Sequence, residues 1–111
     1  MHEMSITQGI IDLCIEHAGG RRVRSLQVEI GELSSAVPDA IEFCFEACSR
    51  ETTLEGARLT ITRVPGRGLC QECGLETPLT ELYEPCRHCG SYRVTVVAGE
   101  ELRLREIEVD D

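Results

Sequence analysis

The stretch CQECGLETPLTELYEPCRHCG, residues 70–90, decides how the middle of this chain folds. It contains two C-x-x-C pairs, Cys70 with Cys73 and Cys86 with Cys89, and twelve residues separate the pairs. Two residues between cysteines let one tight turn present both thiolates to one ion, and zinc takes four such ligands in a tetrahedron. A Gly follows each pair and can adopt the positive φ that such a turn needs. The spacing predicts two knuckles that share one metal ion, which is a zinc ribbon.

Other uses of these four cysteines remain open at this point. A rubredoxin-like iron site has the same ligands, and His88, inside the second pair, could replace a Cys, although a solvent-facing His is favoured. Disulfides are disfavoured because the chain has seven cysteines, an odd number, and no export signal. A closed four-thiolate site has no open ligand position, so the ribbon is expected to hold structure rather than to catalyse.

Composition narrows the class of protein. The chain has 111 residues, enough for one domain with at most a small satellite, and 41% of them are apolar. Aromatic residues make up only 4%, so the core is expected to be aliphatic. A net charge of −9 argues against a nucleic-acid partner. There is neither an apolar run long enough to cross a membrane nor a signal peptide, so we expect a cytoplasmic protein.

Apolar residues at three- and four-residue steps predict an amphipathic helix over residues 3–18. They are Ile6, Ile10, Leu13 and Cys14, and His17 falls on the same face. Two glycines directly after this segment are typical of a helix C-terminus. The first helix is therefore expected to bury the face that carries these five residues.

Alternating apolar and polar residues predict several strands. Their ranges are 23–33, 57–62, a β-rich stretch at 92–98, and 102–109. Between the first two, Ser34 or Ser35 is expected to cap a second helix with Pro38 near its first turn. The whole pattern predicts an α+β fold, a small sheet of about three strands packed with two helices, with the zinc ribbon inserted as a module. We expect one α/β domain from 1–66 with 92–111, and a zinc-ribbon domain at 67–91.

The remaining chemistry-bearing residues suggest no catalytic site. Cys14, Cys44 and Cys48 fall on the apolar helix faces, where plain core packing is the usual role of Cys. Acidic residues such as Glu29 and Glu84 look like a solvated surface. No phosphate-binding loop, nucleophile elbow or zinc-protease motif is present, so an enzyme is not expected.

The first three residues, Met1-His2-Glu3, place a metal-binding side chain at the start of the sequence. The α-amino group, the His2 backbone nitrogen and the His2 imidazole can close adjacent chelate rings on one cation. Deprotonated amide nitrogens suit ions that favour square-planar nitrogen ligation, namely nickel(II) and copper(II). Glu3 can add its amide nitrogen or its carboxylate. The alternative is that an acidic residue here simply favours the dipole of the first helix.

Taken together, these features resemble the HypA/HybF family of nickel metallochaperones for [NiFe] hydrogenase maturation. The resemblance rests on MHE at the start, the amphipathic helix, VEIGELS at 28–34, and the C-x2-C-x12-C-x2-C ribbon. It implies a small α/β nickel domain that carries a zinc domain. The implied nickel-site residues are His2 and Glu3, and the implied zinc ligands are Cys70, Cys73, Cys86 and Cys89.

The resemblance also implies a function and partners. The protein would deliver Ni(II) for insertion into the [NiFe] hydrogenase active site, with a HypB-type GTPase and the hydrogenase large subunit as partners, the latter directly or through the GTPase. Some members of the family also serve urease. A monomer and a homodimer both remain open. The alternative function is a zinc-ribbon protein-interaction module without nickel delivery.

Overall fold

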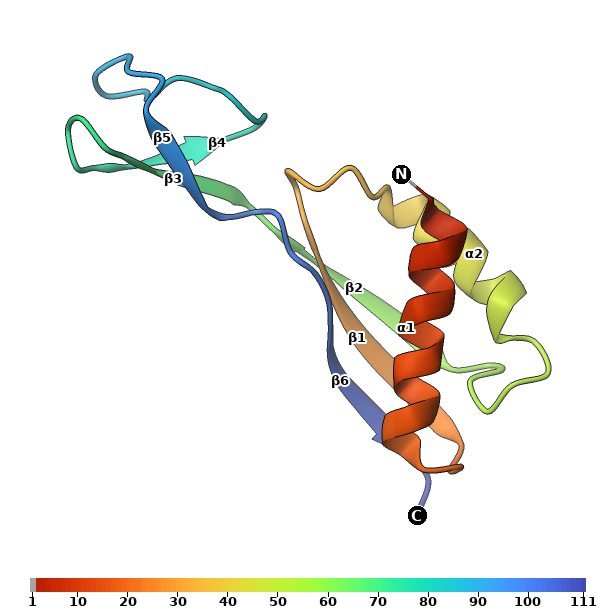
Figure 1. The fold of residues 1–111 in the computed structure, drawn as a ribbon. Coiled ribbons are helices and arrows are strands. Elements are labelled where there is room, and N and C mark those ends of the chain that lie inside the picture. The colour runs from red at the N-terminus through yellow and green to blue at the C-terminus, as the bar shows by residue number, and fades with distance from the viewer. Residues whose placement is uncertain (1) are drawn as a thin grey trace. The chain divides into compact units, whose positions relative to one another are not determined.

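The computed structural model describes residues 2–111, which form two compact units (Figure 1). The first unit comprises 2–29, Ala36–Thr62 and Arg103–Asp111, and the second comprises Ile30–Ser35 and Arg63–Leu102. Within the described part of the chain, no helix combines the length and the apolar character that crossing a membrane requires. The expected α+β class is confirmed, and it is realised as two helices with two three-stranded sheets.

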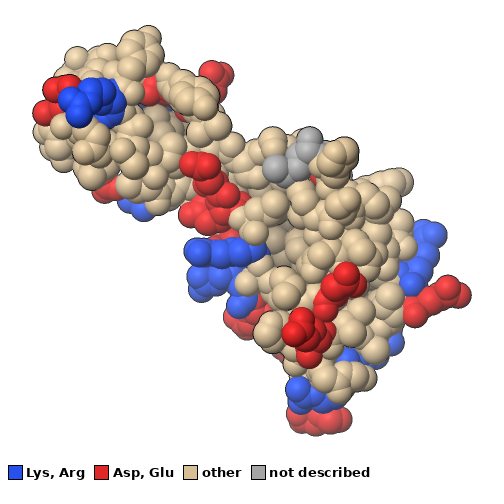
Figure 2. Space-filling model, in the orientation of Figure 1, with Lys and Arg blue, Asp and Glu red and all other residues tan. Residues whose placement is uncertain are grey.

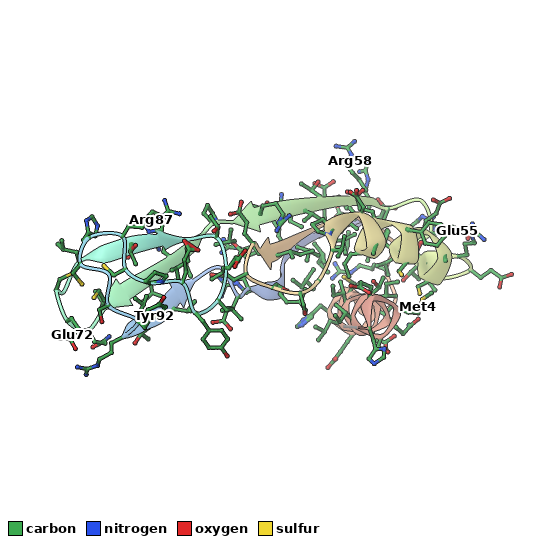
Figure 3. The ribbon with its side chains drawn as sticks, turned by 90° about the horizontal axis from the view of Figure 1, so that it is seen from above. Met4, Glu55, Arg58, Glu72, Arg87 and Tyr92 are labelled. Carbon is green, nitrogen blue, oxygen red and sulfur yellow. The ribbon has the colours of Figure 1, made fainter. Side chains whose placement is uncertain are left out.

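Two helices and most of a three-stranded sheet build the first unit, while the ends of the strands near residues 30, 63 and 102 belong to the second. The helices are α1 (Glu3–Ala18) and α2 (Pro38–Ser49), and the strands are β1 (Val23–Gly31), β2 (Arg58–Val64) and β6 (Leu102–Val109). The sheet has the order β2-β1-β6, so β1 is central and β6 lies at an edge. Both helices lie on the same face of this sheet (Figures 1 and 3). That arrangement leaves the opposite face of the sheet to polar side chains.

The core of the first unit is aliphatic, as the composition predicts. Leu26 and Val28 of β1 are 1% and 0% exposed, and Ile11 of α1 and Ile41 of α2 are 0% and 1% exposed. Removing each such side chain from water stabilises the fold by about 1.5–3 kcal/mol before the entropy of ordering is subtracted. Packing between α1 and α2 therefore sets the position of both helices over the sheet.

The buried face of α1 differs from the predicted one. Leu13 is 44% exposed and His17 is exposed, whereas Thr7 and Ile11 are buried. Thr7 can be buried because its hydroxyl donates a 2.7 Å hydrogen bond to the Glu3 carbonyl, which satisfies its polar group inside the helix. Because α1 packs on both α2 and the sheet, its buried stripe is rotated toward Thr7 and Ile11, away from Leu13 and His17.

The predicted cap of α2 is wrong. The helix begins at Pro38, with Val37 at the N-cap position, and Val37 makes no side-chain cap. The Val37 carbonyl accepts the first helical bond from Ile41 N at 3.0 Å. Pro38 suits this start because its fixed φ is helical and it has no N–H to leave unpaired. Ser34 and Ser35 lie before the helix.

The cysteines outside the ribbon pack as expected. Cys14 is fully buried and Cys44 is buried, and burial raises the pKa of the Cys14 thiol to about 11. Cys48 is half-buried, and its sulfur lies 3.0 Å from the Met4 sulfur, which joins α2 to α1. A thiol with a raised pKa is a poor nucleophile, so Cys14 has a packing role.

The second unit is built on another antiparallel sheet, with the order β4-β3-β5. Its strands are β3 (Gly66–Cys70), β4 (Glu76–Leu79) and β5 (Val94–Ala98). In the register of this sheet, Leu69 pairs with Glu76 and Cys70 pairs with Val94. The β3 strand therefore leads directly into the first cysteine of the ribbon.

Residues 30–35 belong to the second unit because their backbone bonds lie there. Glu32 N donates to the Val64 carbonyl at 2.9 Å, and Leu33 N donates to the Gly99 carbonyl at 2.8 Å. Gly31 is required at this crossing, since a Cβ atom there would lie 1.8 Å from the Gly99 oxygen. The second unit contains residues 30–35 and strand β5. The boundaries of the two compact units therefore differ from those of the domains expected at 1–66 with 92–111 and at 67–91. The assignment of nickel and zinc to those two domains stays a prediction.

Candidate metal centres

Two matching turns carry the four ribbon cysteines. Gly74 N donates to the Cys70 carbonyl at 3.0 Å, and Gly90 N donates to the Cys86 carbonyl at 2.8 Å. Both glycines have positive φ, +75° and +79°. Residues with a side chain rarely adopt this conformation. The role that the sequence predicts for the Gly after each pair is therefore confirmed.

Each knuckle is also tied back to its own first cysteine. Cys70 N donates to the Leu75 carbonyl at 3.0 Å, and Cys86 N donates to the Ser91 carbonyl at 2.8 Å. The same bonds at the same offsets in both turns make the knuckles near copies of each other. Backbone geometry that is fixed in this way directs the sulfurs of both turns toward a common point.

The four sulfur atoms meet at that point, at one end of the second unit (Figure 3). All four lie within 4.8 Å of one another, with 3.6 Å from Cys70 to Cys89 and 3.8 Å from Cys73 to Cys86. A tetrahedral zinc with bonds of about 2.3 Å separates its sulfurs by about 3.8 Å. All seven cysteines are free, so no disulfide competes for these thiols. The donor set and its spacing fit a structural zinc site.

The pKa values of the ribbon thiols also favour a bound cation. Backbone N–H donation from Cys73 is the main cause that lowers the pKa of the Cys70 thiol to about 6. The Ser91 backbone N–H favours the Cys89 thiolate, but the neighbouring Cys70 sulfur and burial outweigh it and raise the pKa of Cys89 to about 12. Sulfurs this close cannot all be negative without a compensating charge. A divalent cation supplies that charge.

His88 does not join the sulfur cluster. Its side chain is exposed, and its ring Nε2 lies 3.1 Å from the Glu76 carbonyl oxygen. Its backbone N–H donates to the Cys86 sulfur at 3.3 Å. The favoured prediction of a solvent-facing His88 is confirmed, and the backbone of this residue, rather than its ring, supports the site.

Glu84 has a structural role that the sequence did not reveal. Its carboxylate accepts hydrogen bonds from the Thr80 backbone N–H at 2.9 Å, the Thr80 hydroxyl at 2.8 Å and the Glu81 backbone N–H at 3.1 Å. These bonds, the Thr80 backbone N–H above all, lower the pKa of Glu84 to about 2. The carboxylate thus closes the loop between the knuckles. A Thr four residues before a Glu is the only local signal, and it is a weak one.

The predicted nickel residues lie where α1 begins. His2 occupies the N-cap position, with φ −94° and ψ 86°, and is exposed, while Glu3 is the first helical residue and is half-buried. The His2 carbonyl accepts a 3.1 Å bond from Ile6 N, which starts the helix. Amide N–H groups before this point are the free donors of a helix N-terminus. The structure thus leaves the His2 imidazole exposed and the amide of Glu3 outside the helical bonding pattern.

Within residues 2–111, no third His, Cys, Asp or Glu side chain is placed with His2 and Glu3 to hold one ion. Among residues 2–111, the ribbon cysteines are the only group of three or more His, Cys, Asp or Glu residues placed to hold one ion. The α-amino group of Met1, the other expected donor, lies outside the described residues.

Comparison with known proteins identifies relatives along the whole chain. A family model described as "Hydrogenase/urease nickel incorporation, metallochaperone, hypA" matches residues 1–109. Hydrogenase maturation factor HypA of Geobacter metallireducens is 61% identical over 110 residues, which cover 99% of this chain and 100% of that protein. The corresponding factor of Geotalea uraniireducens is 56% identical over the same coverage. The solution structure of the Ni metallochaperone HypA from Helicobacter pylori has a TM-score of 0.71 at 30% identity and covers 98% of this chain and 97% of its own.

Proposed function

Because this chain belongs to the HypA family and is thus a nickel metallochaperone of hydrogenase maturation, we propose a role for its own residues in holding nickel. The nickel donors are the His2 imidazole and the backbone nitrogens of His2 and Glu3, completed by the Met1 amino group. The observation that carries this proposal is the exposed N-cap position of His2, before the first helical bond.

This site suits a metal that must be handed on. An exposed helix end lets a partner approach and replace the ligands one at a time. Its nitrogens must be deprotonated to bind, so protons compete with nickel and acid weakens binding. The Glu3 carboxylate is close enough in sequence to ligate nickel or to orient a nitrogen donor.

Zinc has the other role. Cys70, Cys73, Cys86 and Cys89 are proposed to hold one structural zinc ion. When bound, zinc supplies a four-way cross-link between the two knuckles and compensates the charge of their thiolates. The four sulfurs leave no open ligand position, which supports a role as an accessory protein rather than an enzyme.

The expected partners follow from nickel incorporation. We propose a HypB-type GTPase and the hydrogenase large subunit as the proteins that this chain contacts, in the cytoplasm. A net charge of −9 argues against nucleic acid as a further partner. A zinc-ribbon interaction module without nickel delivery has no support, since the nickel-incorporation family covers residues 1–109.

Nickel titration of the untagged, zinc-loaded protein tests the site. His2→Ala is expected to weaken nickel binding by at least about a hundredfold, because it removes a ligand and disrupts the chelate rings. His17→Ala is the matched control, since His17 is an exposed His on the same helix. Zinc content and circular dichroism should be unchanged in both variants.

Acetylation of the α-amino group supplies a second test, because the acetylated amine cannot join the chelate. Nickel affinity should fall while helix content stays the same. Full nickel affinity in either the His2→Ala variant or the acetylated protein would rule out this mechanism. A loss in the His17→Ala variant of the same size would show that the effect is not specific to His2.

A further inference from the structure

The second unit has a groove that none of the four ribbon cysteines lines. Its volume is about 250 Å³. Leu79 of β4 and Val94 and Val96 of β5 are buried or half-buried and form its apolar floor. Pockets for drug-sized ligands measure about 300–1,000 Å³. The groove is therefore of a size for one or two side chains of a partner rather than for a free metabolite.

Gly68 of β3 lets two side chains of this floor meet. A Cβ atom at Gly68 would lie 2.3 Å from Val94 Cγ1 and 2.9 Å from Leu79 Cδ1. Both side chains therefore pack across the bare backbone of β3, which lies between β4 and β5 in the sheet. Because three strands fix the floor, the apolar surface is already formed before anything binds to it.

Two tyrosines line the same groove, and they are half of the aromatic residues in the chain. Tyr83 is 91% exposed and Tyr92 is 76% exposed, and Leu82, which also lines the groove, is 42% exposed. Large apolar and aromatic side chains that gather at one exposed site are typical of an interaction surface. The faces of Tyr rings also attract cations.

The loop that carries Leu82 and Tyr83 is held in place from both sides. The Glu84 carboxylate accepts bonds from the backbone N–H groups of Thr80 and Glu81 and from the Thr80 hydroxyl. Tyr83 has a φ of +65°, which residues with a side chain rarely adopt. The loop thus presents its exposed side chains in a fixed conformation, and a partner loses less entropy when it binds to a surface of this kind.

The charge at the groove is acidic. Glu84 and Glu100 line it, and none of the described residues that line it is basic. Arg87 lies 3.4 Å from Glu84, whereas Glu100 is exposed and takes part in none of the ion pairs found among residues 2–111. Uncharged side chains cover much of the visible face of the second unit (Figure 2). A partner that enters the groove therefore gains by bringing a positive charge to Glu100.

We propose that this groove binds an extended apolar segment of a partner protein that carries an Arg or a Lys. The aliphatic side chains of the segment cover the floor, and its cation contacts a tyrosine ring and the Glu100 carboxylate. A nucleic acid is disfavoured as the occupant, because its phosphates would meet Glu84 and Glu100. The groove contains none of the nickel donors, so this inference does not depend on the nickel site.

Tyrosine fluorescence of the zinc-loaded full chain tests the proposal, because the chain has no Trp and both of its Tyr line the groove. The probes are pentapeptides with a central Arg, Glu or norleucine, flanked by all combinations of Ala, Val, Leu and Pro. The best Arg peptides should bind at least about tenfold more tightly than the same peptides with Glu. Their binding should weaken as salt is added.

Charge reversal at the groove should exchange this preference. The Glu100→Lys variant should bind Glu peptides better than Arg peptides. Glu81→Lys is the matched control and should keep the Arg preference, since Glu81 is exposed in the same unit but does not line the groove. Tyr92→Ser should weaken binding of the Arg peptides at least about fivefold. Leu75→Ser should leave it unchanged, because Leu75 is 51% exposed outside the groove.

Chemical shifts of the unaltered protein keep the test independent of misfolded variants. The best Arg peptide should shift the signals of Tyr83, Tyr92 and Glu100 and leave those of α1 and α2 in place. The proposal is overturned if no Arg peptide binds better than its Glu and norleucine counterparts, or if the bound peptide leaves both tyrosines unshifted. Tyrosine signals that change with protein concentration alone would make a second copy of the chain the occupant and would also overturn it.

Discussion

In the first unit, buried aliphatic side chains from two helices and a sheet form the core, whereas the second unit buries few side chains and two of them are thiols. Ile11, Leu26 and Ile41 are almost fully excluded from water in the first unit. In the second, two of the few buried side chains are Cys70 and Cys86. A unit with so small an apolar interior needs another source of stability, and a cross-linking metal is one.

The same contrast separates the two candidate metal sites. The sulfur cluster is closed and lies where two knuckles converge, so a metal bound there would be part of the fold of the second unit. The expected nickel donors lie at an exposed helix start in a unit that has its own core. The proposed site would therefore let nickel leave without loss of the fold around it. A chaperone with both kinds of site can keep one metal while it transfers the other.

Loss of zinc should produce the largest effect. Chelation, or Cys73→Ser with Cys89→Ser, is expected to unfold the second unit, because structural zinc contributes about 10–16 kcal/mol of apparent binding free energy in comparable small modules. Amide spectra should lose dispersion for β3, β4 and β5. Signals of α1 and α2 should persist, and their loss would show that the first unit also depends on zinc.

Truncation of a core side chain in the first unit should have the second largest effect on stability. Ile11→Ala is expected to lower the free energy of unfolding by about 2–5 kcal/mol, because Ile11 is fully buried. Leu13→Ala on the same helix is the control and should cost about 0.5 kcal/mol, since Leu13 is 44% exposed. Denaturant unfolding with zinc analysis measures both. Equal losses would contradict the observed buried face of α1.

Loss of the Glu84 carboxylate, which closes the loop between the knuckles, should lower stability less than the core truncation does. The effect should be confined to the second unit. Glu84→Gln removes a charged acceptor of three hydrogen bonds and should lower the melting temperature at neutral pH. Because the pKa of Glu84 falls from 4.5 to about 2 on folding, its contribution is complete above pH 4.5 and is lost as the pH falls toward 2.

Glu81→Gln is the matched control for Glu84→Gln. Glu81 supplies its backbone N–H to the Glu84 carboxylate, and its own carboxylate makes none of the hydrogen bonds or ion pairs found among residues 2–111. Thermal unfolding followed at amides of the second unit should separate the two variants. If the Glu84→Gln and Glu81→Gln variants had the same melting temperature, the Glu84 carboxylate would not stabilise the second unit.

The smallest effect is expected at an exposed ion pair beside the ribbon. Glu72, labelled in Figure 3, accepts a 2.7 Å bond from Arg93, and the two side chains are 49% and 70% exposed. Arg93→Gln should lower the free energy of unfolding by only about 0.2–1 kcal/mol, because water and salt screen the pair. Differential scanning calorimetry at two salt concentrations measures it, and a loss comparable to that of Ile11→Ala would contradict this ranking.

Sequence spacing predicted the local parts of the fold well. The positive φ of Gly74 and Gly90 and the exposure of His88 follow from short-range geometry, since a tight turn involves only neighbouring residues. The prediction of which face of α1 is buried was partly wrong, because periodicity alone does not indicate how a helix is rotated against its two neighbours. Leu13 is apolar and fits the pattern, yet packing leaves it exposed.

Residue types and their spacing were enough to predict which four cysteines meet, the presence of two helices, and the aliphatic nature of the core. These features depend on residue type and on spacing over a few positions. Three features appeared only in the folded chain: residues 30–35 join the second unit, β5 pairs with β3, and β6 lies at an edge. Pairing between distant segments depends on backbone bonds and on close approaches such as that of Gly31 to Gly99, which no local pattern records.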